Sequence, residues 1–167
     1  MLHLRGRAFR VVAVAAMATA GLVMTAASGM AADSHQGASS APAKEKEWTQ
    51  TFIGASITQD DGSMLTVGAV ENSLDGDGAT VAKVTLTGNR GTDTATRYTA
   101  KGVSKHEEEF TLGAPDANGM IPITGSGKCV KGGTGVYKGG KCNYTFTGTL
   151  NPNTNVVAIN ITGTTTR

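Results

Sequence analysis

The stretch NYTFTGTL, residues 143–150, decides the fold class of this chain of 167 residues. Tyr144, Phe146 and Leu150 alternate with Asn143 and three threonines. Successive side chains of a β-strand point to opposite faces, so this alternation predicts a strand with one apolar face and one polar face. Residues 155–164 repeat the pattern, because Val157, Ile159 and Ile161 share one side.

Similar segments recur along the chain, separated by turn-forming sequences such as DDG and LDGDG. No stretch shows a sustained helical period. The connections are too short for crossover helices, which favours antiparallel hairpins over parallel pairing. We therefore predict an all-β domain, an antiparallel β-barrel or sandwich of about eight strands. The expected strands are residues 48–57, 64–70, 81–86, 92–103, 106–112, 120–129, 143–150 and 155–164.

A closed barrel of about eight strands is just wide enough to fill itself with side chains or to hold one small ligand. The many Gly, Ala and Thr residues fit either arrangement, so the sequence leaves open whether the interior is a cavity or is filled. Apolar alternation gives one set of residues that we expect to line it: Leu65, Val67, Val84, Phe110, Tyr144 and Phe146.

The first 32 residues have the composition of a secretion signal. Arg5, Arg7 and Arg10 precede an apolar run at 11–23, and small residues follow. The run is too short for a membrane anchor, because about 20 residues are needed to cross a bilayer as a helix. We expect residues 1–32 to be a signal peptide, 33–46 a flexible leader and 47–167 one domain, which would be secreted and not inserted into a membrane.

Removal of that signal would lower the formal net charge from +2 to −1, because three of the 15 Lys and Arg residues are lost and all 13 Asp and Glu residues remain. A chain with this balance and no basic cluster lacks the electrostatic attraction that nucleic-acid binding requires. We therefore expect no nucleic-acid partner. The sequence leaves open whether the domain forms a homo-oligomer.

Cys129 and Cys142 are the only cysteines. In an exported protein such a pair favours a disulfide, and closing a loop of this size stabilises a fold by about 3 kcal/mol in the simple entropic model. The alternative is a catalytic thiol, for which His106 would be the available base. We favour the disulfide.

The glycine-rich segment between these cysteines carries a resemblance to a known family. Residues 123–148, ITGSGKCVKGGTGVYKGGKCNYTFTG, resemble the allene oxide cyclase barrel family and its dirigent relatives in the GGTG-aromatic turn at 132–137 between two strands. The resemblance implies a calycin-like antiparallel barrel that binds a small apolar or aromatic molecule and assists a cyclisation or isomerisation. It supplies no transferable catalytic residue. A non-catalytic extracellular module with a solid barrel is the alternative.

Few other residues indicate chemistry. Glu107, Glu108 and Glu109 follow His106, and alternation sends only Glu108 to the side of Phe110; we favour a solvated edge strand over an acid–base site. Asp75 and Asp77 offer too few ligands for a calcium loop. We expect no metal and no redox cofactor, so any enzyme activity would be that of a cofactor-independent isomerase or cyclase.

Overall fold

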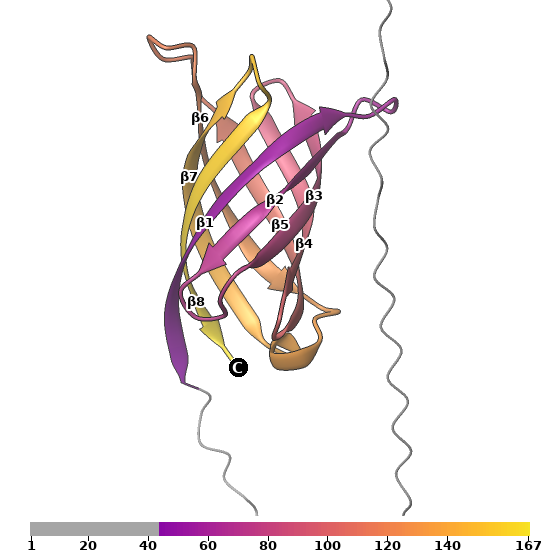
Figure 1. Cartoon of the computed structure of the whole chain (residues 1–167), viewed down its shortest axis with the longest axis vertical. Coiled ribbons are helices and arrows are strands. Elements are labelled where there is room, and N and C mark those ends of the chain that lie inside the picture. The colour runs from indigo at the N-terminus through magenta and orange to yellow at the C-terminus, as the bar shows by residue number, and fades with distance from the viewer. Residues whose placement is uncertain (1–43) are drawn as a thin grey trace, which may run out of the picture. The chain divides into compact units, whose positions relative to one another are not determined.

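The computed structural model describes residues 44–167, which form a closed barrel of eight antiparallel strands (Figure 1). The all-β prediction and the number of strands are confirmed. The strands are β1 (Glu45–Thr58), β2 (Met64–Asn72), β3 (Gly78–Thr87), β4 (Arg90–Thr99), β5 (Gly102–Leu112), β6 (Ile121–Val130), β7 (Lys141–Asn151) and β8 (Val156–Thr166).

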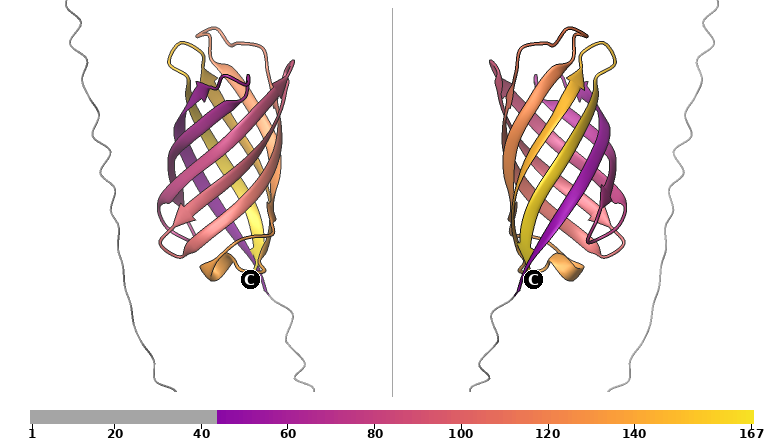
Figure 2. Two further views of the ribbon diagram at one scale, coloured as in Figure 1. Left: turned by 90° about the vertical axis from the view of Figure 1, so that its right-hand side faces the viewer. Right: turned by 90° about the vertical axis from the view of Figure 1, so that its left-hand side faces the viewer.

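Each strand pairs with its neighbours in sequence, and β1 pairs with β8 to close the barrel (Figure 2). Tight turns make this connectivity possible. Gly62 and Gly88, in the β1–β2 and β3–β4 turns, have φ of 79° and 62°, a conformation that glycine adopts without a Cβ penalty. Because the number of strands is even, Glu45 pairs with Thr166 at one end, which we name the lower end.

The β6–β7 loop folds back against the lower end of the barrel. It contains a single 3-10 turn, η1 (Gly135–Tyr137). Its backbone bonds to the start of β5, where Thr134 N donates to Val103 O at 2.8 Å, and to the β4–β5 turn, where Val136 N donates to Lys101 O at 3.1 Å. The hydroxyls of Tyr137 and Thr99 lie 3.0 Å apart. The loop that carries the family resemblance therefore packs across the lower end instead of projecting into solvent.

A disulfide joins Cys129 of β6 to Cys142 of β7 at the lower end, as the sequence predicts. No free cysteine remains in the described chain, so the alternative of a catalytic thiol is wrong. A disulfide of this kind is typical of an oxidising compartment outside the cytoplasm.

Aromatic side chains from facing strands fill much of the barrel. Trp48, Phe52, Tyr144 and Phe146 all belong to the larger core cluster and are 4–6% exposed. The ring centres of Trp48 and Tyr144 lie 5.5 Å apart in an edge-to-face arrangement, a favoured geometry for aromatic pairs.

Two sequence expectations about strands are wrong. Residues 92–103 do not form one strand, because β4 ends at Thr99 and β5 begins at Gly102. The face of β2 is also reversed: Thr66 and Val70 are buried, whereas Val67 is 44% exposed. Apolar alternation places Leu65 and Val67 inside only if the interior is apolar throughout, and here the interior side of β2 carries Thr66 and Asn72.

The expected signal peptide, 1–32, and most of the expected leader lie outside the described residues. Glu45 and Lys46, which we assigned to the leader, belong to β1. Within residues 44–167, no helix is long and apolar enough to cross a membrane.

Candidate functional site

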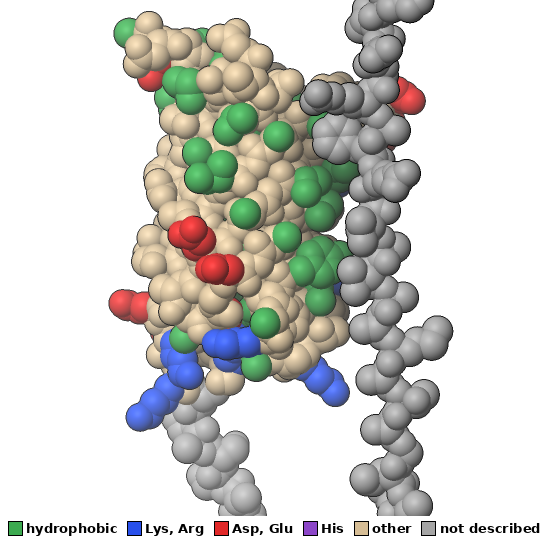
Figure 3. Space-filling model, viewed as in Figure 1, with side chains coloured by type: hydrophobic (Ala, Val, Ile, Leu, Met, Phe, Trp, Pro, Cys, Tyr) green, Lys and Arg blue, Asp and Glu red, His purple; other side chains and the backbone are tan. Residues whose placement is uncertain are grey.

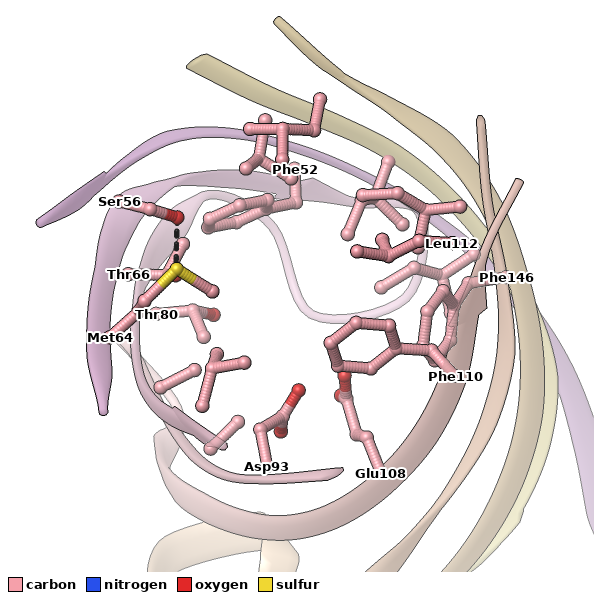
Figure 4. Close-up of a pocket in the computed structure, with 18 of the residues that line it drawn as sticks. Phe52, Ser56, Met64, Thr66, Thr80, Asp93, Glu108, Phe110, Leu112 and Phe146 are labelled. Carbon is pink, nitrogen blue, oxygen red and sulfur yellow. Dashed lines mark hydrogen bonds between the residues drawn. The ribbon is translucent and has the colours of Figure 1, made fainter. Parts of the chain in front are cut away.

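A cavity of about 90 Å³ lies inside the barrel, with lining residues from all eight strands (Figure 4). One water needs roughly 10–15 Å³ on this measure, so the space suits a small organic molecule. Most of its lining side chains are apolar. Leu86 lines the cavity and is 37% exposed, which places an opening beside the β3–β4 turn at the upper end. The apolar lining residues include Phe52, Met64, Ala82, Val84, Ala95, Phe110, Phe146 and Ile161.

Two carboxyl groups interrupt this apolar lining. Asp93 of β4 and Glu108 of β5 are direct cross-strand partners. Both side chains point into the cavity, side by side and opposite Phe52 (Figure 4). Side chains directly opposite in an antiparallel pair have Cβ atoms about 5 Å apart, so neither carboxyl can ionise without affecting the other.

The surroundings of Glu108 are rich in hydrogen bonds. The Tyr144 hydroxyl donates to Glu108 Oε1 at 2.6 Å and lies 3.1 Å from His106 Nδ1. The Ser104 hydroxyl lies 2.8 Å from His106 Nε2. The Tyr144 hydroxyl has one proton and donates it to Glu108, so the hydroxyl oxygen must accept from His106. His106 therefore carries its proton on Nδ1, and its unprotonated Nε2 accepts from the Ser104 hydroxyl. One directed chain thus runs from Ser104 through His106 and Tyr144 to Glu108.

The pKa directions agree with this chain. Burial, together with the charge of Arg97, lowers the pKa of His106 to about 3, so its ring is neutral. Burial and the neighbouring Glu108 raise the pKa of Tyr144, which keeps its hydroxyl protonated. Glu108 therefore accepts from a donor that keeps its proton over the whole physiological pH range.

Asp93 has the opposite environment. Burial, and then the charge of Glu108, raise its pKa to about 8. Its Oδ1 atom is buried and has no hydrogen-bond partner in the described chain. Burial also raises the pKa of Glu108, but the Tyr144 hydrogen bond and the charge of Arg97 oppose that shift. When the pair holds a single proton, the hydrogen bond from Tyr144 and the charge of Arg97 favour Glu108 as the ionised member and Asp93 as the protonated one.

Arg97 forms part of the wall of the cavity. It is 5% exposed, its guanidinium lies 5.5 Å from the centre of the Trp48 ring, and burial lowers its pKa. Arg97 Nε and Thr80 Oγ1, like Asp93 Oδ1, are buried without a partner among residues 44–167. All three residues line the same cavity, which thus has unused polar atoms in its wall.

The six residues expected to line the interior fall into three groups. Val84, Phe110 and Phe146 line the cavity. Tyr144 is buried beneath it and contacts Glu108. Leu65 and Val67 are not among the lining residues and belong to the outer side of β2, which corrects that part of the expectation.

The interpretation of 107–109 as a solvated edge strand is also wrong, because the barrel is closed and β5 pairs on both sides. Only Glu107 and Glu109 are exposed, and Glu107 forms an ion pair of 3.3 Å with Lys128. Alternation correctly separated Glu108 from its neighbours. Sequence reasoning missed Asp93 and Arg97, whose significance depends on the β4–β5 register.

Potential metal ligands also meet at the lower end. A ring nitrogen of His106 and the sulfurs of Cys129 and Cys142 lie within 4.8 Å of one another. Zinc binds thiolates, and both sulfurs are oxidised here, so these three residues do not suit it in the disulfide form. Asp75, one of the two aspartates considered for calcium, lies in the β2–β3 turn and forms an ion pair of 2.6 Å with Arg167.

Comparison with known proteins adds no assignment: no family model, no curated protein and no solved structure matches this chain.

Proposed function

We propose that this protein binds a small apolar or aromatic molecule inside its barrel. One observation carries the proposal: a largely apolar cavity of about 90 Å³ has buried polar atoms without partners in its wall. Unpaired buried polar atoms are costly, and a ligand with one polar group would relieve that cost while filling the apolar space. The disulfide supports a place of action outside the cytoplasm, as a secreted protein.

The binding would serve a cofactor-independent isomerisation or cyclisation. The allene oxide cyclase and dirigent resemblance supports this function, since its glycine-rich loop belongs to a barrel of the kind that the resemblance implies. The chain adds a pair of carboxyl groups in the cavity wall, Asp93 and Glu108, which suits proton transfer. Confinement would orient the bound molecule against them.

A substitution that fills the cavity tests the binding. Ala95 is 5% exposed and lines the cavity, so Ala95→Leu should occupy part of the space. Thr94→Leu, at the adjacent outward position, is the matched control. We expect toluene and cyclohexanone to bind the wild type and Thr94→Leu in ligand-observed NMR, and to bind Ala95→Leu at least tenfold more weakly. Circular dichroism confirms that each variant is folded; a folded wild type that binds neither probe contradicts the proposal.

The outer surface favours a second candidate, a non-catalytic interaction module. Ile53 and Ile57 of β1 are 63% and 60% exposed, and Val67 of the neighbouring strand β2, which pairs with Ala55 between them, is 44% exposed. Figure 3 shows several hydrophobic side chains at the surface of the barrel. Exposed apolar side chains that cluster are typical of protein contacts, which here include self-association. Sedimentation of the wild type and of Ile53→Ser/Ile57→Ser tests this candidate: a monomeric wild type with an intact ligand site leaves ligand binding as the function.

A further inference from the structure

We propose that Asp93 and Glu108 form a general acid–base pair that moves a proton between carbon atoms of a small neutral ketone bound in the cavity. This inference rests on the proposed ligand binding and goes beyond it by naming the reaction, the substrate class and the role of each carboxyl group.

Glu108 is the base. The Tyr144 hydroxyl donates to its Oε1 at 2.6 Å, which stabilises the carboxylate and fixes one of its oxygens. His106 and Ser104 hold that hydroxyl from behind, so the donor is oriented before any ligand arrives. Because Glu108 also lines the cavity, its carboxylate can receive a proton from a bound molecule.

Asp93 is the acid. It faces Glu108 directly across the β4–β5 pair, and two adjacent carboxyl groups do not both ionise readily in an apolar space. No hydroxyl or amide donates to its buried Oδ1 atom within the described chain, in contrast to Glu108. The shared proton therefore belongs on Asp93, which can donate it to an oxygen atom of the ligand.

The charges around the cavity select a neutral ligand. With Asp93 protonated and Glu108 ionised, as the proposed roles require, the positive charge of buried Arg97 balances the one negative charge of the pair. An anionic or cationic ligand would add an unbalanced charge to a largely apolar space, which is unfavourable. A ketone brings an oxygen acceptor without charge, and the Asp93 carboxyl and the Thr80 hydroxyl, both in the cavity wall, are donors for it.

The reaction balances without a co-reactant. In a β,γ-unsaturated ketone the C–H bond between the carbonyl group and the alkene breaks, and Glu108 takes the proton. Asp93 gives its proton to the carbonyl oxygen, so a neutral dienol forms. Glu108 then delivers its proton to the γ-carbon while the oxygen returns the other proton to Asp93, leaving the conjugated ketone and the original pair.

The test uses 3-cyclohexen-1-one, whose conversion to 2-cyclohexen-1-one is followed by the ultraviolet absorbance of the conjugated product. In D2O, NMR also reports deuterium incorporation next to the carbonyl group. We expect turnover by the wild type, with a loss of about 10²–10⁴-fold in Asp93→Asn and in Glu108→Gln. Glu107→Gln, an exposed neighbour on the same strand, should keep full activity.

Two further measurements keep the outcomes distinct. Ligand-observed NMR measures binding of the probe to each variant, and circular dichroism reports folding. A wild type that binds the ketone but neither isomerises nor deuterates it overturns the acid–base inference while ligand binding stands. A folded wild type that does not bind it overturns this inference, and the cavity probes above then decide the proposed function. The wild-type rate should also fall as the pH rises through about 8, where Asp93 loses its proton.

Discussion

The ring of Tyr144 lies directly over Gly127, its cross-strand partner on β6. A Cβ atom at Gly127 would overlap the ring and the hydroxyl of Tyr144. Phe146 covers Gly125 in the same way, and Phe110 covers Gly91. Glycines beneath the rings thus let three aromatic side chains lie close against the wall, so that the barrel holds both an aromatic core and a cavity.

Gly127→Ala should therefore displace Tyr144 and lower the free energy of unfolding by about 1–3 kcal/mol, the usual cost of overpacking. Urea denaturation measures the change. Gly140→Ala is the control, because a Cβ there would be no closer than 3.5 Å to its neighbours and the substitution should be nearly neutral. Equal effects of the two substitutions would mean that the ring does not need this space.

Tyr144→Phe should lower stability by about 1–3 kcal/mol, because Glu108 and His106 lose their shared hydroxyl while remaining buried. Loss of this donor should also raise the pKa of Glu108 further and weaken it as a base at low pH. Urea denaturation and the pH profile of ketone isomerisation measure both effects. Tyr98→Phe, at a residue that is 48% exposed, should change neither.

The stability of the protein should fall as the pH rises from about 6.5 to 8. Asp93 has a folded-state pKa of about 8 against an ordinary value of 3.8, so across this window the folded state binds more protons than the unfolded state. The loss is at most about 1.4 kcal/mol per pH unit for one proton. Asp93→Asn should make the free energy of unfolding less dependent on pH in this range.

Below that window His106 acts in the opposite sense. Its pKa of about 3 in the folded state, against 6.5, means that the unfolded state binds the extra proton between these values. Stability from this group is therefore lost as the pH falls from 6.5 to 3, where it offsets the gain from Asp93. Equilibrium denaturation at a series of pH values measures how stability changes above and below pH 6.5. If the stability of Asp93→Asn fell between pH 6.5 and 8 as steeply as that of the wild type, Asp93 would not be the group responsible.

Replacing both disulfide cysteines by alanine should lower the free energy of unfolding by about 3 kcal/mol, because the chain between two cysteines 13 positions apart is no longer closed into a loop in the unfolded state. Denaturation of the wild type with and without a reductant gives the same comparison without a substitution. An unchanged urea midpoint in both experiments would show that the β6–β7 pairing alone holds the lower end.

The strands were largely predictable from sequence because side-chain alternation and glycine-containing turns are local signals. The segments at 143–150 and 155–164 fall within β7 and β8. The turn at residues 100–101 was missed because Gly102, the glycine with φ of 139° that follows it, stands alone between two threonine-rich and charged stretches that both alternate like strands. The choice of face on β2 failed for a different reason, since this interior accepts Thr66 and Asn72 and leaves Val67 outside.

The site was only partly predictable. Alternation separated Glu108 from Glu107 and Glu109, but its meaning depends on Asp93, which is 15 positions earlier in the chain. Which residue of β4 faces Glu108 is set by the register of the hairpin, and the sequence around Asp93 carries no motif that fixes it. His106 was considered only as a base for a thiol, because its link to Glu108 runs through Tyr144 on another strand.

The even strand number has a practical consequence. Glu45 and Thr166 are neighbours at the lower end, the end where the β6–β7 loop also lies (Figure 2). Leu86, which lines the cavity and is 37% exposed, belongs to the opposite end of the barrel. A tether attached through the C-terminus, to a resin, a cell wall or a fused protein, would therefore hold the barrel upright with its entrance turned outward. Immobilised protein should exchange small molecules with the surrounding medium as freely as protein in solution.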